Sequence, residues 1–242
     1  MTLEWIKIIV TENWPMFVRG AAVTMFISII STIIGAIIGL IIGIIRTMPV
    51  PERGFKRIVL KTVVAVLTAY IEFFRGTPMI AQAMVIYYGS ALAFGIHMNR
   101  LSAAIFIVSI NTGAYMAEIV RGGIISIDKG QFEAANALGM NHMQTMLNVV
   151  LPQVIRNILP ATGNEFVINI KDTSVLNVIS VTELYFQTKT ISGNNFRYFE
   201  SFFVACVIYF VMTFTVTRIL RLIERKLDGP ENYNLMGNQM QV

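Results

Sequence analysis

Long runs of apolar residues alternate with short polar segments along this chain of 242 residues. Each run is near or above the roughly 18 residues that a membrane-spanning helix needs. The runs lie at about 20–45, 58–94, 101–120, 154–180 and 198–220. We therefore predict an all-α polytopic membrane protein with five transmembrane helices, folded as a single domain over residues 1–242.

The second run, 58–94, is interrupted at Arg75-Gly76-Thr77-Pro78. Proline removes a backbone donor, and the residue before it avoids helical geometry. We predict one long span that is broken here, because neither half is comfortable as a span alone. Non-helical backbone at membrane depth is tolerated where protein or a cavity covers it.

Glycine marks one face of the first run, where Gly35, Gly39 and Gly43 are spaced by four. Small residues at this spacing let another helix approach closely, although glycine is also tolerated in membrane helices without such a contact. Outside the runs, we expect a turn at Pro15 and a polar loop over 181–197 that turns at Gly193-Asn194-Asn195.

Composition narrows the class of protein. Hydrophobic residues make up 55% of the chain and charged residues only 14%, whereas charged residues are about a quarter of an average soluble domain. The net charge of +5 sits mostly in polar segments, so it indicates membrane topology and we expect no nucleic-acid partner. No GxxxxGK[ST] phosphate loop is present, no serine has a His/Asp partner pattern, and His97 and His142 are far apart. We expect neither a catalytic site nor a metal site.

The distribution of Lys and Arg predicts the orientation in the membrane. With five spans the termini lie on opposite sides, and the side richer in Lys and Arg is cytoplasmic. An outside N-terminus leaves few cations outside, namely Lys7, Arg19, Arg100, Lys189 and Arg197. It places many more inside, namely Arg46, Arg53, Lys56, Arg57, Lys61, Arg121, Lys129, Arg156, Arg218, Arg221, Arg225 and Lys226. We predict an outside N-terminus and a cytoplasmic polar tail at 227–242.

The segment 129–147, between the third and fourth runs, has an amphipathic pattern. Its apolar residues recur at three- to five-residue steps, which predicts one helix with an apolar stripe. The stripe consists of Phe132, Ala135, Leu138, Met143, Met146 and Val150. Such a helix can lie at the cytoplasmic membrane surface and dock into a groove of a soluble partner, although periodicity alone also fits an ordinary amphipathic helix. Two complete spans within 58–94 would instead place this helix outside.

A spaced motif crosses this segment. Glu133-Ala134-Ala135 is followed by Gly139 and then, after nine further residues, by Val149-x-Leu151-Pro152. This closely resembles the EAA signature of importer-type ABC transporter permeases, with Val149 in place of the family's isoleucine. Four further stretches look like the polar amino-acid branch of these permeases: FRGTP at 74–78, AEIVRGGI at 117–124, KGQFEAANALG at 129–139 and GNEFVINIKDTS at 163–174. The resemblance covers nearly all of the chain from about residue 15.

The resemblance implies the type I ABC importer permease fold, with 129–147 as a coupling helix docked on an ABC ATPase subunit. The residues coupled to the ATPase would be Glu133, Ala134, Ala135, Leu138 and Gly139. Two copies of that ATPase would bind ATP and Mg²⁺, while this chain binds no cofactor. We also expect a second permease, either a copy or a paralogue, and an extracytoplasmic binding protein that delivers a polar amino acid. Gly139 resembles the family glycine that allows a bend within the connector.

Ionisable residues in the predicted fourth span point to the substrate. Glu165, Asn169 and Asp172 have the four- and three-residue spacing that puts them on one face of a helix. Glu165 would lie roughly 18 Å along the span, near the midplane. A charge there is costly unless it is paired or hydrated. Either these acids pair with Lys171 or Arg75, or they line a central cavity.

In the cavity interpretation, Asp172 attracts an α-ammonium group and Glu165 attracts a cationic or amide side chain. The resemblance to relatives that carry cationic amino acids favours Arg, Lys or His, with glutamine, glutamate or cystine as the alternative. Arg75 either holds a substrate carboxylate or satisfies the carbonyls that the break frees, and we expect Tyr115 to be a packing residue.

Two other classes of function are open to the sequence. A secondary transporter driven by an ion gradient would explain the intramembrane acids and the broken span, but not the spaced EAA motif. A membrane scaffold or sensor without transport activity would predict no acids facing a cavity. The importer is the function that accounts for all three features.

Overall fold

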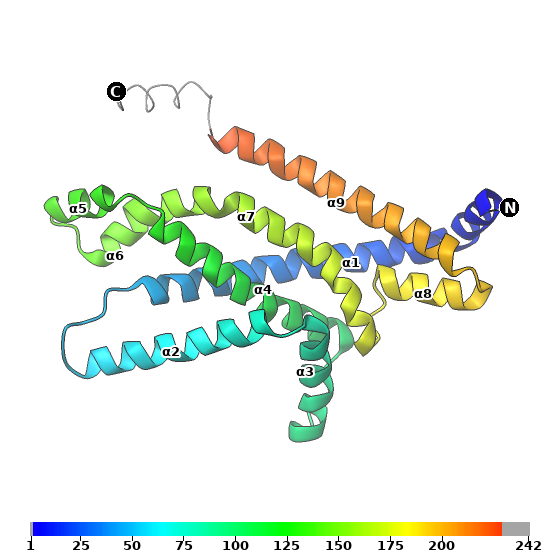
Figure 1. Cartoon of the computed structure of the whole chain (residues 1–242), viewed down its shortest axis with the longest axis horizontal. Coiled ribbons are helices and arrows are strands. Elements are labelled where there is room, and N and C mark those ends of the chain that lie inside the picture. Colours follow the sequence, from blue (N-terminus) through cyan, green and yellow to red (C-terminus); the bar gives the residue numbers. More distant parts are fainter. Residues whose placement is uncertain (1, 229–242) are drawn as a thin grey trace.

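The computed structural model describes residues 2–228, and every regular element among them is a helix, as predicted (Figure 1). The α-helices are α1 (Thr2–Thr47), α2 (Phe55–Gly76), α3 (Met79–Phe94), α4 (Arg100–Ile125), α5 (Lys129–Ala137), α6 (His142–Thr145), α7 (Leu151–Asp172), α8 (Leu184–Asn195) and α9 (Tyr198–Asp228). A π-helical turn, Met146–Val150, joins α6 to α7, and a 3₁₀ helix, Thr173–Ile179, follows α7. The tail predicted at 227–242 falls largely outside the described residues.

The long helices α1, α2, α4, α7 and α9 run lengthwise, while α3 lies across them (Figure 1). Helices α5 and α6 lie at one end of the molecule, and α8 and the N-terminus lie at the other (Figure 1). Three described helical segments are long and apolar enough to cross a membrane, namely Leu3–Thr47, Arg100–Ile125 and Tyr198–Lys226. The five crossings, which also require the less apolar α2 and α7, stay a prediction.

Helix α4 is the centre of the bundle and packs on α1 along its length. The glycines of α1 make this possible: a Cβ on Gly39 would lie 2.3 Å from Cβ of Met116, and one on Gly43 would lie 2.6 Å from Cγ1 of Val120. The glycine face of the first run is therefore a helix contact. Of the most apolar stretch of α4, 67% is buried, against 17% for α9, so α9 is the most open of these helices.

Helix α1 continues without interruption through the position where the sequence predicted a turn. Pro15 lies inside it, so the expected turn is wrong. Ile9 and Phe17, on either side of Pro15, are buried with Leu184 of α8 and Val204 of α9. This packing holds the helix together although Pro15 gives up one backbone hydrogen bond.

The polar loop expected at 181–197 is also wrong, because the segment contains α8. The carboxylate of Glu183 accepts hydrogen bonds from the backbone N–H groups of Tyr185 (2.8 Å) and Phe186 (2.7 Å) and so caps the helix. The chain turns at Phe196, with φ of 55°, rather than at Gly193-Asn194-Asn195. Leu184 and Ile191 anchor α8 in the core, and the ring of Tyr185 packs on Phe202 of α9, so few apolar residues are needed.

The predicted break in the second run is confirmed. Helix α2 ends at Gly76, Thr77 is extended with φ of −124° and ψ of 149°, and α3 begins after Pro78. Helix α3 does not continue the line of α2 but turns across the bundle (Figure 1). The fourth run also changes form, because its α-helix ends at Asp172 and continues as a 3₁₀ helix to Ile179.

Candidate functional site

Side chains from α3 and α4 satisfy the backbone groups that the break between α2 and α3 exposes. The amide nitrogen of Gln82 donates to the carbonyl oxygens of Phe74 (2.9 Å) and Thr77 (3.0 Å). The amide nitrogen of Asn111 donates to the carbonyl oxygen of Phe74 (3.3 Å) and to Oε1 of Gln82 (2.9 Å). Arg75 takes no part in this network, so the alternative in which it satisfies the freed carbonyls is wrong.

A cavity of about 320 Å³ lies beside the break. It is lined by Thr77, Pro78, Met79, Asn111, Tyr115, Glu165, Ile168, Asn169 and Asp172. Three of the four predicted substrate residues therefore come together on one face of α7, opposite the break and α4. Arg75, the fourth, does not line the cavity, but its guanidinium carbon lies 5.4 Å from the centre of the Tyr115 ring.

The carboxylates of this cavity have no ion-pair partner within the described part of the chain. Arg75 interacts electrostatically with Glu165 without forming a direct ion pair. Lys171 lies on the other side of α7, in a groove against α9. The alternative in which Lys171 or Arg75 forms a direct ion pair with these acids is therefore wrong, although Lys171 acts electrostatically on Asp172 as Arg75 does on Glu165.

Asn169 is buried, and its amide is fully engaged. Its nitrogen donates to Oγ1 of Thr32 on α1 (2.9 Å), and it forms a hydrogen bond with Oγ1 of Thr112 on α4. These contacts tie α7 to both central helices. Asn169 thus shapes the cavity wall, and its contact with a substrate stays a prediction.

Two residues of this site were not predicted from the sequence. Asn111 was not singled out, and Tyr115 was expected to pack, although both line the cavity. A signal was available, because polar residues four apart within an apolar run share one face of a helix. Gln82 was harder to find from the sequence, because the groups that it binds lie on other elements.

The segment 129–147 bends at Gly139, which has φ of 76°. The single helix expected there is wrong, because α5 ends at Ala137 and α6 begins at His142. Asp128 caps α5 by accepting from the N–H of Gly130 (2.7 Å), and Asn141 with Gln144 forms a capping box on α6. The bend that the resemblance implied at Gly139 is thus present.

The bend splits the predicted apolar stripe into two sets. Met146 and Val150 are buried in a cluster that includes Val120 and Ile124 of α4, Phe132 packs against this cluster, and Ala135 is also buried. Leu138 is 81% exposed and Met143 is 59% exposed. The exposed set, with the exposed Glu133 and Ala134, forms an outward surface at the end of the molecule.

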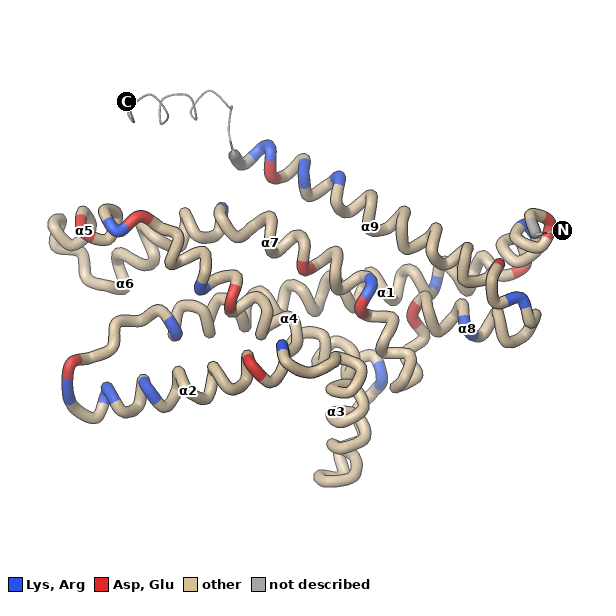
Figure 2. The backbone as a smooth tube through the Cα atoms, in the orientation of Figure 1, with Lys and Arg blue, Asp and Glu red and all other residues tan. Residues whose placement is uncertain are grey.

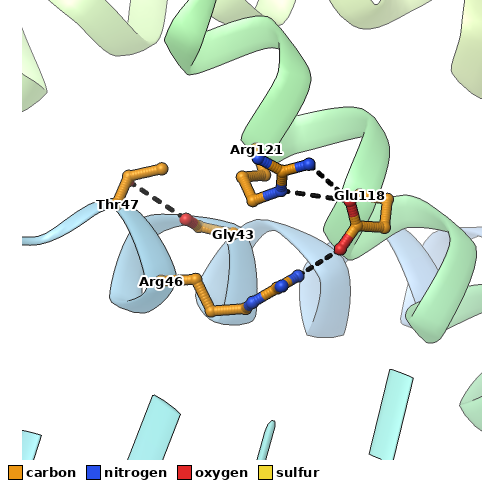
Figure 3. A network of polar contacts seen from close by, with 5 residues as sticks. All are labelled: Gly43, Arg46, Thr47, Glu118 and Arg121. Carbon is orange, nitrogen blue, oxygen red and sulfur yellow. Dashed lines mark hydrogen bonds and ion pairs between the residues drawn. The ribbon is translucent and has the colours of Figure 1, made fainter. Parts of the chain in front are cut away.

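An ion cluster joins α1 to α4 (Figure 3). Glu118 accepts from Arg46 through Oε1 and from Arg121 through Oε2, at 3.0 Å from Nε and 2.9 Å from Nη2. The side chains of Arg46 and Glu118 are only 14% and 21% exposed. From the sequence, Glu118 and Arg121 were marked only as part of the 117–124 stretch, with Arg121 also counted as an inside cation, and their pairing with Arg46 was not predicted.

Comparisons with known proteins give one consistent result. Residues 58–229 match the family described as binding-protein-dependent transport system inner membrane component. The glutamine transport system permease protein GlnP of Escherichia coli (strain K12) is 39% identical over 214 residues, covering 88% of this chain and 93% of GlnP. The arginine transport system permease protein ArtQ of Bacillus subtilis (strain 168) is 36% identical over 160 residues, covering 66% of this chain and 73% of ArtQ.

Comparison with solved structures also identifies ABC transporters as similar. A crystal structure of an amino acid ABC transporter with histidines matches with a TM-score of 0.79 at 37% identity, covering 90% of this chain and 96% of that one. An inward-facing MetNI methionine ABC transporter matches with a TM-score of 0.69 at 21% identity, over 88% and 99% of the two chains. The second match bears on the fold alone.

Proposed function

This chain belongs to the family of binding-protein-dependent transport system inner membrane components, and we propose that it is the permease subunit of an ABC importer for a polar amino acid. The expected type I importer fold is confirmed by the two structural matches. The observation that carries the substrate class is the cavity between the helix break and α7, with two carboxylates that lack an ion-pair partner in the described chain. GlnP and ArtQ, named for glutamine and arginine transport, support a polar amino acid.

The two acids of the cavity and the nearby Arg75 each suit one part of an amino acid. Asp172 binds the α-ammonium group, and Glu165 binds the side chain. Arg75, above the Tyr115 ring, approaches the carboxylate as the substrate enters. Both acids line the cavity, whereas Arg75 and Lys171, which act electrostatically on Glu165 and Asp172, do not, and this favours arginine, lysine or histidine as the substrate.

Glutamine is the second candidate, with glutamate or cystine as further members of the same class. The cavity contains the amide of Asn111 as well as Glu165, and both can accept from a carboxamide nitrogen. The similarity to GlnP, at 39% identity, supports this candidate as strongly as ArtQ supports arginine.

The outward surface of α5 and α6 supports docking of an ABC ATPase. The exposed Leu138 and Met143 fill a groove of that subunit, flanked by Glu133 and Ala134. Two ATPase copies bind ATP and Mg²⁺, and a second permease, a copy or a paralogue, completes the pathway. An extracytoplasmic binding protein delivers the substrate at the opposite end, near α8.

The charge distribution supports an outside N-terminus. Lys and Arg gather at the start of α2 and the end of α9, at the same end of the molecule as α5 and α6 (Figure 2). The positive-inside rule makes that end cytoplasmic. This orientation gives the proposed ATPase surface access to ATP.

The test is ATP-dependent uptake of a labelled amino-acid panel by the reconstituted complex with its ATPase and binding protein. For a cationic substrate, Glu165→Gln lowers kcat/KM by about 10- to 100-fold, the worth of a charged hydrogen bond. Glu12→Gln, which changes an exposed acid on α1, serves as the matched control.

Three outcomes separate the candidates. Uptake of glutamine with no effect of Glu165→Gln assigns Glu165 a structural role and favours the glutamine candidate. Uptake that needs an ion gradient and not ATP contradicts the importer and supports a secondary transporter. No uptake of any amino acid in the panel contradicts the substrate class.

A further inference from the structure

A groove between α7 and α9 carries positive charge from both helices and lies on the side of α7 away from the acidic cavity. A cavity of about 270 Å³ is lined by Lys171 and Val167 of α7 and by Arg218 and Arg221 of α9, among others. A second cavity of about 130 Å³ shares Val167, Thr217 and Arg221 with it, so the two form one continuous groove. Helix α7 thus separates an acidic site from a basic one.

The cations converge because the two helices are antiparallel. Gly163 of α7 lies against Leu220 of α9, whereas Lys171 shares its cavity with Phe210. Side chains on a helix tilt toward its N-terminus, so those of α7 and α9 tilt toward one another along the groove. The guanidinium carbon of Arg218 lies 4.8 Å from the centre of the Phe214 ring, one turn toward the start of α9.

Within the described chain the charge of this groove is only partly offset, because Asp172 interacts electrostatically with Lys171. Lys171, Arg218 and Arg221 form no ion pair with a described carboxylate, and Glu224 lines the groove without pairing to them. Cations held together in a membrane protein are costly unless an anion joins them. The groove therefore has the charge of an anion site whose ligand comes from outside the chain.

The walls of the groove indicate which anion. Phe210 is 65% exposed and Phe214 is 47% exposed, and both line the groove beside the cations. Only 17% of the most apolar stretch of α9 is buried, so little of the described chain covers this helix. A small anion would use the cations alone, whereas a phospholipid also has acyl chains to cover the exposed phenylalanines.

We propose that this groove binds the phosphate headgroup of an anionic phospholipid through Lys171, Arg218 and Arg221, with an acyl chain along Phe214 and Phe210. The choice of leaflet rests on the proposed orientation with an outside N-terminus. The C-terminal half of α9 is then cytoplasmic, so the lipid belongs to the inner leaflet. The binding itself does not depend on the transported substrate.

The experiment is native mass spectrometry of the permease–ATPase complex, released from nanodiscs of equal phosphatidylglycerol and phosphatidylethanolamine without ATP. Wild type retains phosphatidylglycerol preferentially. Neutralising all three cations with Lys171→Gln, Arg218→Gln and Arg221→Gln weakens retention by about fivefold per cation, or about a hundredfold together. The control, Arg53→Gln with Lys56→Gln and Lys61→Gln, removes as many exposed charges at the start of α2 and leaves retention unchanged.

Two further variants separate a site from general charge or a folding defect. Val167→Phe fills the groove, keeps every cation and also abolishes retention. Arg218→Lys with Arg221→Lys keeps the charge and retains the lipid within about fivefold. Thermal unfolding of each complex verifies that the bundle is intact.

Several results would overturn the proposal. One is an equal loss of phosphatidylglycerol from the triple groove variant and from the α2 control variant. Another is undiminished retention of phosphatidylglycerol by the triple groove variant. A crosslink between two permeases through Thr217→Cys in a Cys206→Ala background would show that protein covers the groove. Displacement of the lipid by inorganic phosphate at equal concentration would show a free-anion site. Because no step requires ATP or substrate, failure of the importer function would leave these results unaffected.

Discussion

Gly39 shows how one residue without a side chain sets the distance between two helices. A Cβ there would lie 2.3 Å from Cβ of Met116 and 2.6 Å from its carbonyl carbon, so backbone as well as side chain would have to move. The spacing of Gly35, Gly39 and Gly43 suggested a contact face from the sequence, but not which helix would fill it. That choice depends on α4, whose small buried residues the pattern does not mark.

Gly39→Ala lowers the stability of the bundle. The added methyl group overpacks the α1–α4 contact, at a cost of about 1–3 kcal/mol. Thermal unfolding of the purified complex measures the effect as a lower Tm. The same change at Gly122 on α4 meets no atom within 4 Å and leaves Tm unchanged or slightly higher, so an equal drop in both variants would contradict the contact.

Contacts between residues that are distant in sequence could not be predicted from the sequence. The spacing of Glu165 and Asp172 placed both acids on one face, and the structure confirms that they share a cavity. Glu118, by contrast, pairs with Arg46, which is 72 positions away. Local periodicity determines the face of a helix, whereas an ion pair between helices depends on how those helices pack.

At the scale of the element, the bend between α5 and α6 depends on a left-handed residue. Gly139 has φ of 76°, which most side chains disfavour and asparagine tolerates. The sequence resemblance marked this glycine, yet the apolar stripe still suggested one continuous helix. The apolar periodicity continues through the bend because Phe132 and Met146 pack in the same cluster from either side of it.

Gly139→Val uncouples uptake from ATP hydrolysis without unfolding the protein. A left-handed valine would cost about 1–3 kcal/mol, and the bend, which has no atom within 4 Å of a Cβ at this position, avoids that cost by changing conformation and so reorients the surface formed by Leu138 and Met143. Uptake per ATP hydrolysed falls, while Tm of the complex changes little. Gly139→Asn retains coupling, and Glu133→Gln weakens it; unchanged uptake after changes at both positions would rule out the coupling role.

Helix α8 depends on a buried acid that sequence analysis left in a loop. Burial raises the pKa of Glu183, although hydrogen bonds from Tyr185, Phe186 and Tyr209 act to lower it. The folded state therefore holds this proton more tightly than the unfolded chain, so stability falls as pH rises above 4.5, the ordinary value, through the raised pKa.

Glu183→Gln removes that pH dependence. The Tm of wild type minus that of the variant is largest in acid and decreases between about pH 4 and pH 8. Scans of both proteins in the same detergent measure this difference. A difference that grows with pH would contradict the raised pKa, and Glu12→Gln, at an exposed position, is the control.

At the scale of the whole molecule, the apolar runs predicted the fold class and the family motif predicted the architecture. The runs could not show that α3 turns across the bundle, because its composition is as apolar as that of a span. Nor could they reveal α8, which is polar along most of its length. Both elements owe their positions to neighbours that are remote in sequence.

The predicted orientation is open to a direct labelling test in intact cells. In a Cys206→Ala background, a membrane-impermeant maleimide labels Thr190→Cys, an exposed position on α8, from outside. It labels Asn136→Cys, an exposed position on α5, only after permeabilisation. The reverse pattern would place the proposed ATPase surface outside and refute the orientation.

One helical run joins the two ends of this mechanism. Helix α6, the π-helical turn and α7 follow one another without a loop from His142 to Asp172, so Met143 of the outward surface and both cavity acids belong to one continuous helical run. A displacement imposed at one end must carry Glu165 and Asp172 past Asn111 and Tyr115. Thermodynamic linkage makes the coupling reciprocal. If nucleotide binding changes the affinity for the amino acid by some factor, the amino acid must change nucleotide affinity in the ATPase by the same factor. Nucleotide titrations at rising substrate concentration would therefore measure, on the ATPase side, how strongly the amino acid favours one position of the helical run.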